Sequence, residues 1–371
     1  MKIEVWTWGT GGPFGRELGA SSSRRRRGHT ATSIVVSDGR DGGATAHYMI
    51  DAGAPAVETM IEKGVSSPQI LFISHPHFDH ISDLDRLANS RMRGLMLRRG
   101  IRDLEEAKAL FGPLVVVGAD ECINHPADGV RARFGYLEGL VAWKPISAYD
   151  TWHSVRQDDP RGGKEGSIEI RRADQESSGS KADMTADMIG EEERAAPSKG
   201  PESATRTEIC LPLEFKLLPV RHSKHAPGSS IFVFRWRRRG VGQGVPEDGG
   251  GRLRPRNVVI SGDFKSMDDR VVDSPDLIDP ACLVLDTNTI RACGKYHASF
   301  EENRSLIDRW TTGDEEVLVL LNHISGFGDY VEGFYDGVPD DRDWQEAVDG
   351  YAPKPGVAIR IAEDGSCHRI I

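Results

Sequence analysis

Three histidines and one aspartate within six residues form the segment of this sequence whose residue types most clearly suggest chemistry. The segment Ser74–His80 reads Ser-His-Pro-His-Phe-Asp-His and ends a short apolar run. A strand that ends in a tight loop can aim His75 and His77 at one point, and Asp79 and His80 at a second point close by. Imidazole and carboxylate groups bind zinc at about 2.0–2.2 Å, and two metal ions about 3.5–4 Å apart can activate one water molecule. We therefore predict a metal pair, rather than a surface loop that happens to contain histidines.

Further ligand candidates follow three other apolar runs. The candidates and the runs before them are His222 after 215–220, Asp263 after 258–262, and His323 after 317–322. In layered α/β folds, sites collect just beyond the ends of such strands. Taken singly, each residue is more often structural, such as a capping aspartate or a core histidine with satisfied hydrogen bonds. Counting the first segment, four groups of candidate residues each follow an apolar run, and this repetition favours a shared site.

Strands and helices alternate along the sequence, which predicts an α/β layered domain. We expect strands at 1–8, 32–36, 47–50, 70–74 and 114–117, and helices at 54–64, 83–88 and 103–110. Residues 156–206 are polar with few large apolar groups, which predicts a disordered insertion with a short strand at 167–170. A Gly/Pro/Arg-rich stretch at 240–257 predicts a long hairpin loop. Motif residues lie on both sides of each stretch, so we expect a single domain over residues 1–371.

The overall composition narrows the class of protein. The 371 residues carry a net charge of −10 and 38% of them are hydrophobic, which argues against a general nucleic-acid coat protein but allows a local basic path to a site. The five cysteines include no CxxC pair, so we expect neither a disulfide framework nor a cysteine zinc site. The sequence contains no signal-peptide h-region and no apolar run long enough to span a membrane, which predicts a cytoplasmic protein without a membrane partner.

The order of these motifs resembles the metallo-β-lactamase superfamily from residue 3 to about residue 361. The shared pattern is HxHxDH, then a histidine, a Gly-Asp pair and another histidine, each at a strand end. The resemblance implies a four-layer αββα sandwich, two divalent metal ions, and Asp51 as a support of the metal loop. It implies a first metal on His75, His77 and His222, a second metal on Asp79, His80 and His323, and a bridging Asp263. Zinc is the expected metal, and manganese or iron would accept the same ligands.

A second segment narrows the resemblance to the ribonuclease Z-like phosphodiesterases. Residues 295–302 read Lys-Tyr-His-Ala-Ser-Phe-Glu-Glu and precede Leu-Asn-His-Ile-Ser at 321–325, at a spacing comparable to the Gly-His-Ser-Thr and Leu-Thr-His-Ile-Ser segments of that group. There the extra histidine is a general acid for the departing oxygen, and His297 matches it. The structural alternative is that His297 caps a helix at 300–309. Residues 75–82 also resemble the class II cyclic-nucleotide phosphodiesterases, and a homodimer would be in keeping with the group.

One departure from ribonuclease Z affects the expected substrate. That family carries His-Glu-Ala-Thr where this chain has Leu-Asp-Thr-Asn-Thr at 285–289, so a histidine is missing, although Asp286 could still position His297. We find no match to its tRNA-gripping arm. We therefore expect phosphodiester hydrolysis, with a cyclic nucleotide or small cyclic phosphate favoured as substrate over RNA cleaved in the manner of tRNA 3′ processing. A thioester or lactam hydrolase of the same superfamily is the further alternative, although those enzymes generally lack a counterpart of His297.

The resemblance also suggests a mechanism. A water or hydroxide that bridges the two metals attacks phosphorus. Asp79 orients that nucleophile or accepts its proton, and His297 protonates the departing oxygen. A redox di-iron protein is disfavoured because that branch has glutamate at the position of His77. A non-catalytic binding module is disfavoured because all the ligand positions are intact.

Two further features leave alternatives open. Arg24–Arg27 and Arg91–Arg102 are basic runs that are either solvated surface or, in one case, a contact for the substrate phosphate. His225 follows His222 by three residues and could replace it as a ligand. We favour His222, because Gly228 then follows at the spacing of the family.

Overall fold

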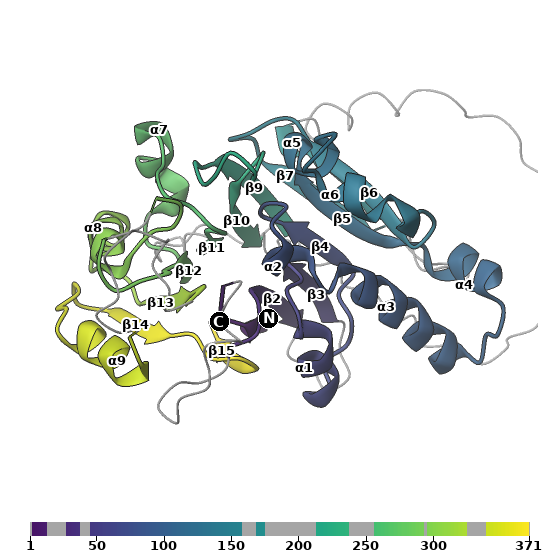
Figure 1. Ribbon diagram of the computed structural model, residues 1–371, viewed down its shortest axis with the longest axis horizontal. Helices are drawn as coiled ribbons and strands as arrows, with labels where there is room; N and C mark the ends of the chain where they lie inside the picture. Colours follow the sequence, from purple (N-terminus) through teal and green to yellow (C-terminus); the bar gives the residue numbers. More distant parts are fainter. Residues whose placement is uncertain are drawn as a thin grey trace, which may run out of the picture.

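Two β-sheets packed face to face form the centre of the molecule, and helices flank the outer face of each sheet (Figure 1). The computed structural model describes residues 2–12, 27–37, 45–157, 168–174, 213–236, 256–292, 295–324 and 339–370. The layers run in the order helices, sheet, sheet, helices. This is the αββα architecture that the sequence predicts.

The first sheet has seven strands in the order β15-β1-β2-β3-β4-β5-β6. They are β1 (Lys2–Gly9), β2 (Ala31–Ser37), β3 (Thr45–Ile50), β4 (Ile70–Ile73), β5 (Leu114–Ala119), β6 (Val141–Ile146) and β15 (Ser366–Arg369). The strands from β3 to β6 pair in parallel, whereas β15, β1, β2 and β3 pair antiparallel. β4 lies inside the sheet with every residue buried, as expected for the apolar run before the histidine segment.

The second sheet has eight strands in the order β14-β13-β12-β11-β10-β9-β7-β8. They are β7 (His153–Gln157), β8 (Ile168–Arg172), β9 (Leu213–Pro219), β10 (Ser230–Trp236), β11 (Val258–Ile260), β12 (Cys282–Asp286), β13 (Val317–Asn322) and β14 (Val357–Ile361). The strands from β11 to β14 pair in parallel, and β10 pairs antiparallel with both β9 and β11. β9 and β11 therefore run in the same direction.

The helices divide between the two sheets (Figure 1). Beside the first sheet are α1 (Ala56–Glu62), α2 (Phe78–Ile81), α3 (Leu84–Arg99), α4 (Leu104–Phe111), α5 (Asp120–Asn124), α6 (Val130–Phe134) and the 3₁₀ turn η1 (Gly135–Leu137). Beside the second are α7 (Asp269–Val272), the 3₁₀ turn η4 (Pro275–Leu277), α8 (Phe300–Trp310) and α9 (Asp341–Asp349). The predicted helix at 83–88 is too short, because α3 continues to Arg99 and ends where Gly100 adopts a left-handed φ of 69°.

Aromatic side chains join the two sheets in the main core. Phe72 of β4 in the first sheet packs edge to face against Phe215, Phe232 and Phe234 of the second, with ring centroids 5.0, 5.3 and 5.1 Å apart. Such pairs add about 0.5–1.5 kcal/mol each beyond their buried area. The strand that carries the histidine segment is thus fixed against the sheet that carries the other candidates.

A second core fills the space between the second sheet and its helices. On β12, Val284 belongs to the core between the sheets, while its neighbours Leu283 and Leu285 belong to the outer core with Trp310 of α8 and Trp344 of α9. Because successive side chains of a strand point to opposite faces, a strand covered on both sides must be apolar throughout. This explains the continuous apolar runs before His323 and Asp263.

The described part of the chain includes one strand inside the predicted insertion. β8 (Ile168–Arg172) pairs antiparallel with β7 at the edge of the second sheet, close to the short strand expected at 167–170. The remainder of the insertion and nearly all of the loop at 240–257 lie outside the described residues. Strands β10 and β11, which that loop connects, pair as predicted. None of the helices that the structure describes combines the length and apolar character needed to cross a bilayer.

His47 of β3 has a buried imidazole and is not part of the histidine segment. Its Nδ1 donates to the Ser66 carbonyl oxygen at 2.5 Å, and its Nε2 accepts from the Ser33 hydroxyl at 2.7 Å, which in turn accepts from Trp8 Nε1 at 2.7 Å. These partners suit a neutral ring with one donor and one acceptor. Burial lowers the pKa of His47 to about 4, and the hydrogen bond to Ser66 offsets only part of that effect.

We expect His47 to make stability depend on pH in the acid range. The unfolded imidazole takes up a proton near pH 6.5, whereas the folded one has a pKa of about 4, so the free energy of unfolding falls as the pH drops through this interval. The full difference is on the order of 3 kcal/mol. Urea unfolding at neutral pH and near pH 4.5 measures it, and His47→Gln should lose less stability over this interval than the wild type. An equal loss in both proteins would contradict the prediction.

Candidate metal centre

The carboxyl ends of several strands meet at one edge of the sandwich, and the predicted site residues follow these ends. His75, His222 and Asp263 lie two or three residues beyond β4, β9 and β11, and His323 directly follows β13. Parallel strands of one sheet end at the same edge, and the packing of Phe72 brings β4 alongside. The backbone φ of His323 is 60°, a left-handed value that is uncommon for residues other than glycine and clusters at functional sites.

Asp51 at the end of β3 fixes the histidine segment. Its carboxylate accepts hydrogen bonds from the Ser74 amide (2.7 Å), the Ser74 hydroxyl (2.7 Å) and His80 Nδ1 (2.8 Å). The backbone φ of Asp51 is 58°, a left-handed value directly after the last residue of β3. Asp51 thus lies where the sequence expects a support for the metal loop, and its partners orient the rest of that loop.

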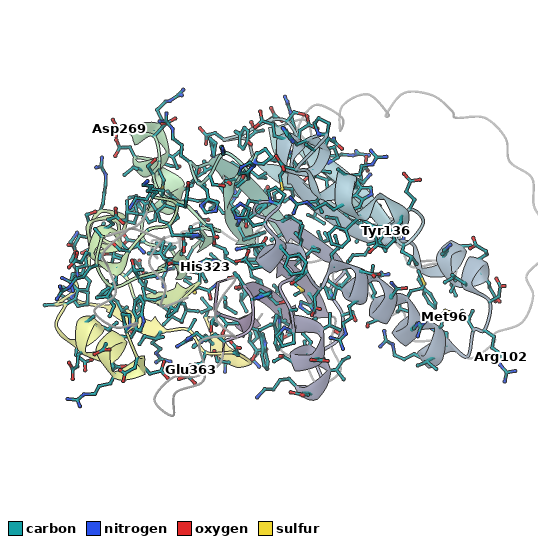
Figure 2. The ribbon with its side chains drawn as sticks, in the orientation of Figure 1. Met96, Arg102, Tyr136, Asp269, His323 and Glu363 are labelled. Atoms are coloured by element: carbon teal, nitrogen blue, oxygen red, sulfur yellow. The ribbon has the colours of Figure 1, made fainter. Side chains whose placement is uncertain are left out.

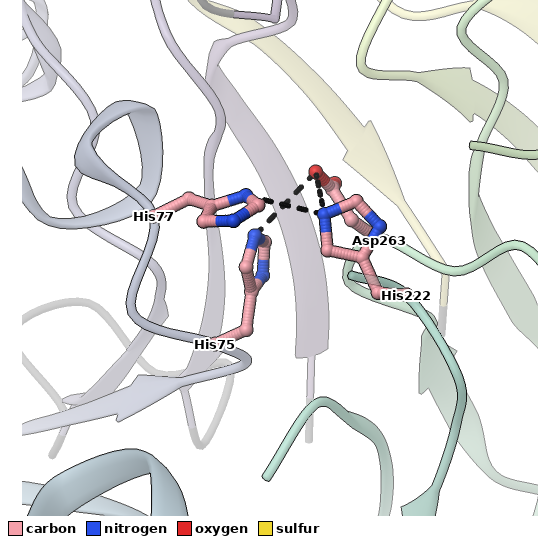
Figure 3. A group of neighbouring side chains, drawn as sticks. All are labelled: His75, His77, His222 and Asp263. Carbon is pink, nitrogen blue, oxygen red and sulfur yellow. Dashed lines mark hydrogen bonds and ion pairs between the residues drawn. The ribbon is translucent and has the colours of Figure 1, made fainter. Parts of the chain in front are cut away.

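A first group of ligand atoms comes from His75, His77, His222 and Asp263, all within 4.8 Å of one another (Figure 3). His222 Nε2 lies 3.1 Å from His77 Nδ1 and 3.8 Å from Asp263 Oδ2. His75 Nε2 lies 3.6 Å from the same Asp263 oxygen. Figure 3 shows the three imidazoles and the carboxylate turned toward a common point.

A second group shares Asp263 with the first and adds Asp79, His80 and His323. Asp263 Oδ2 lies 3.2 Å from His80 Nε2 and 3.1 Å from His323 Nε2. His323 Nε2 is also 3.1 Å from Asp79 Oδ2. The seven residues predicted as ligands are therefore all brought together, and Asp263 is the member common to both groups.

Each histidine of the two groups has one ring nitrogen turned to the centre and the other held by the protein. The outer nitrogens contact the Ser74 hydroxyl for His75, the Ser223 hydroxyl for His77, the Asp51 carboxylate for His80, the Tyr296 carbonyl for His222, and the Asn288 amide for His323. Histidines that ligate metals usually have such an outer partner, which fixes the tautomer and the orientation of the ring.

Several buried polar atoms that face this space have no hydrogen-bond partner. In the described part of the chain they include His75 Nε2, His80 Nε2 and both carboxylate oxygens of Asp263. Each unsatisfied buried polar atom costs about 1–3 kcal/mol, so their concentration at one point indicates a bound group that would satisfy them. Imidazole nitrogens and carboxylate oxygens form a donor set for zinc, manganese or iron. The residues present thus fit divalent metal ions.

The electrostatics of the site divide its histidines into two kinds. Burial lowers the pKa of His77 and of His222 to about 4, although the Asp263 carboxylate opposes it. Burial also acts on His80 and His323, but the carboxylates, Asp263 foremost, outweigh it, raising the pKa of His80 well above its usual value and that of His323 to about 10. Burial would raise the pKa of Asp263 itself, yet the surrounding imidazoles hold it well below its usual range. The centre therefore attracts positive charge.

His297 lies at the rim of the second group. Its Nδ1 is 3.3 Å from Asp286 Oδ2 and 3.5 Å from Asp263 Oδ2, and its side chain is 14% exposed. Burial alone would lower the pKa of His297, but the Asp286 and Asp263 carboxylates raise it. The helix-cap alternative is wrong, because Ser299 is the N-cap of α8 and forms a capping box with Glu302.

Asp286 contacts more of the site than the sequence indicates. Besides His297, its carboxylate lies 3.3 Å from His323 Nδ1 and accepts from the Phe264 amide at 3.1 Å. Sequence reasoning missed Ser223 and Asn288 as outer partners. Ser223 directly follows His222 and Asn288 lies two residues from Asp286, so their places beside motif residues are the signal that could have identified them.

The other candidates take different positions. His225 is exposed and its nearest charged partner is Asp128 at 4.0 Å, so the structure brings His222 into the cluster and leaves His225 outside. Arg27 is buried and donates to the Thr10 hydroxyl and the Ala362 carbonyl, so it is neither solvated surface nor a free phosphate contact. Arg24 to Arg26 lie outside the described residues.

The second basic run does not reach the cluster. Arg102 lies at one end of the molecule, well apart from His323 near its middle (Figure 2), and Arg91 is buried and donates to the Gly112 carbonyl at 3.2 Å. Neither end of this run is therefore placed to contact a phosphate at the cluster. Helix α3, which contains the run up to Arg99, extends away from α2 (Figure 1).

Comparison with known proteins agrees with this geometry. A sequence profile of the metallo-beta-lactamase superfamily matches residues 26–93. The crystal structure of a diphosphatase from the PhnP family superposes with a TM-score of 0.54 at 14% identity, covering 100% of this chain and 97% of that one. This chain has the metallo-β-lactamase fold. No curated protein matches its sequence.

Two further structures share the metallo-β-lactamase fold with this chain. YhfI from Bacillus subtilis has a TM-score of 0.51 at 14% identity, with 100% of both chains covered. The long-form ribonuclease Z from yeast has a TM-score of 0.51 at 12% identity, with 99% of this chain and 42% of the yeast chain covered. At these identities the likeness establishes the fold.

We expect divalent zinc to raise the midpoint of thermal unfolding, because an ion that binds only the folded state stabilises it by about 2.7 kcal/mol at a free concentration near 100 times its dissociation constant. His222→Ala should reduce this rise and lower the metal content measured by elemental analysis. His225→Ala is the matched control, because that imidazole is exposed and outside the cluster. Equal metal content in the two variants would show that His222 is not a ligand.

Proposed function

We propose that this protein is a metal-dependent phosphodiesterase. His75, His77 and His222 would hold one divalent ion, expected to be zinc, and Asp79, His80 and His323 would hold a second, with Asp263 as the residue common to both groups. The proposal rests on two features found together: polar atoms at the centre that have no hydrogen-bond partner, and outer imidazole nitrogens that are held by the protein. Together these orient ligands before any ion binds.

When bound, such ions supply Lewis-acid stabilisation of phosphoryl oxygens and make a water molecule acidic enough to attack near neutral pH. Asp79 lies beside the space where a nucleophilic water would stand, with Oδ2 3.1 Å from His323 Nε2 and 3.7 Å from His80 Nε2. We assign to its carboxylate the orientation of that water and acceptance of its proton. A buried carboxylate that is already fixed needs little reorganisation during the reaction.

His297 is the residue that we assign to the departing oxygen. Asp286 holds its Nδ1, which leaves Nε2 as the atom that carries the proton to be given up. Donation to an alkoxide is needed for phosphoesters of alcohols, because such alkoxides are poor leaving groups. This placement favours phosphoryl chemistry over the thioester and lactam hydrolases of the superfamily.

The choice among phosphodiester substrates rests on two further observations. The PhnP-family neighbour is a diphosphatase and the yeast neighbour is a ribonuclease Z, so both act on phosphate esters or anhydrides. Arg91 is buried and Arg102 lies well apart from His323 (Figure 2), so neither of these two arginines offers RNA a contact beside the cluster. We therefore favour a cyclic nucleotide or a small cyclic phosphate, with RNA as the second candidate.

We expect His297→Ala to retain bound metal and to lose activity most severely with poor leaving groups. General acid catalysis contributes roughly 10²–10⁴-fold, so kcat for an alkyl phosphodiester should fall by about that factor. Hydrolysis of a 4-nitrophenyl ester should fall much less, because 4-nitrophenolate departs without a proton. Elemental analysis of the wild type and the variant checks that both retain the same amount of metal. Equal losses for both leaving groups would remove His297 from the role of acid.

The substrate class is tested by a panel on metal-loaded protein. Cyclic nucleotides, a generic phosphodiester, precursor tRNA and a thioester are compared by kcat/KM. We expect the highest values with cyclic phosphodiesters and at least tenfold lower values with the thioester. A thioester that is the best substrate of the panel would overturn the proposed function, and a preference for precursor tRNA would replace the favoured substrate by RNA.

A further inference from the structure

A cavity of about 350 Å³ adjoins the candidate metal centre on the side of His222. It lies between α5 and the loop that connects β9 to β10. Its walls include Glu121, Tyr149, Val220, Arg221 and Ala226. This volume is at the lower end of the range of about 300–1,000 Å³ found for small-molecule sites.

One end of the cavity reaches the ligand residues. His222 and Ser223 both line it. His222 also faces the centre through Nε2, and the Ser223 hydroxyl contacts His77 Nε2 at 3.2 Å. A substrate whose phosphate lies at the cluster could therefore extend its non-reacting part into the cavity past His222.

The walls on either side of the cavity are held closely together. Gly228 has a φ of 68°, and a Cβ placed on it would lie 2.5 Å from the Cys122 amide nitrogen of α5. Only glycine allows this approach. The backbone on the two sides of the cavity is therefore in close contact where Gly228 meets α5, and the ring of Tyr149 also forms part of the wall.

The polar groups of the cavity offer acceptors next to an apolar surface. Val220, Ala226 and the Tyr149 ring supply the apolar part. The Glu121 side chain is exposed at the first turn of α5, and Arg221 is paired with Asp268 at 3.0 Å. The guanidinium is thereby directed to a partner outside the lining, and the Glu121 carboxylate is the strong acceptor of the cavity.

We propose that this cavity holds the nucleobase of a nucleotide substrate, with Glu121 accepting hydrogen bonds from ring and amino N–H groups of the base. A flat ring with polar edges matches an apolar wall with one carboxylate, and two acceptor oxygens match a base with adjacent N–H donors, as in guanine. The inference rests on the proposed function, because it places the phosphate of the same molecule at the metal centre.

The test compares a cyclic phosphate that carries a nucleobase with one that carries none. Metal-loaded wild type, Glu121→Gln and Asp120→Asn are assayed with guanosine 3′,5′-cyclic phosphate and with glycerol 1,2-cyclic phosphate. A hydrogen bond to a charged group contributes about 1.5–3 kcal/mol, so Glu121→Gln should raise KM for the guanosine ester at least about 10-fold more than for the glycerol ester. Asp120→Asn makes the same charge change one residue away, outside the cavity lining, and should not alter this ratio.

A second measurement is independent of turnover. Calorimetry with guanosine, which has no phosphate, should give a dissociation constant that rises about 10-fold in Glu121→Gln and is unchanged in Asp120→Asn. If the wild type hydrolyses phosphodiesters but Glu121→Gln matches it in both measurements, the cavity proposal is overturned and the proposed function stands. If no phosphodiester is hydrolysed, the proposed function fails, and guanosine binding alone then decides for or against the cavity.

Discussion

The hydrogen bonds of the buried Asp51 carboxylate are the interaction on which the site depends. The segment after β4 contains several polar residues at the edge of an apolar sandwich, and burial of so many polar groups is costly unless they are paired. Asp51 pairs with the amide and hydroxyl of Ser74 and with His80 Nδ1. One carboxylate thereby fixes both the start of the loop and the outer nitrogen of a central histidine, and a loop of this composition would have no single conformation without it.

The same constraint explains why the site lies between two sheets. Each sheet supplies only part of the candidate ligand set: the first carries the histidine segment, and the second carries His222, Asp263 and His323. The distance of 3.2 Å between His80 Nε2 and Asp263 Oδ2 therefore requires the sheets to have one relative position. The aromatic contacts of Phe72 with Phe215, Phe232 and Phe234 provide it. The packing of the core therefore determines the distances between the candidate ligands at the edge of the sheets.

Much of this could be predicted from the sequence because the ligands follow recognisable strands. Each of the four segments that carry predicted ligands comes after an apolar run, and parallel strands end together. The length of α3 is underestimated, because arginines, Arg91 among them, interrupt the apolar residues Leu84, Leu87, Ala88 and Met92 that form its buried face. The burial of Arg27 could not be predicted from the sequence either, because its hydrogen-bond partner Ala362 is distant along the chain and Thr10 lies in a different segment. Local pattern identifies elements and their ends, whereas contacts between distant segments need the folded chain.

Asp286 shows how a departure from a family motif can be absorbed by the fold. A shorter acid replaces the glutamate of the resembled group, yet it ends β12 between α8 and β13 and reaches both His297 and His323. Because one carboxylate contacts both residues, the position of His297 is coupled to that of a residue in the second ligand group. The cavity on the other side of the centre contacts His222 and not Asp286. If the proposed roles hold, recognition of the non-reacting part of a substrate and delivery of a proton to its leaving oxygen depend on different residues and would be altered separately.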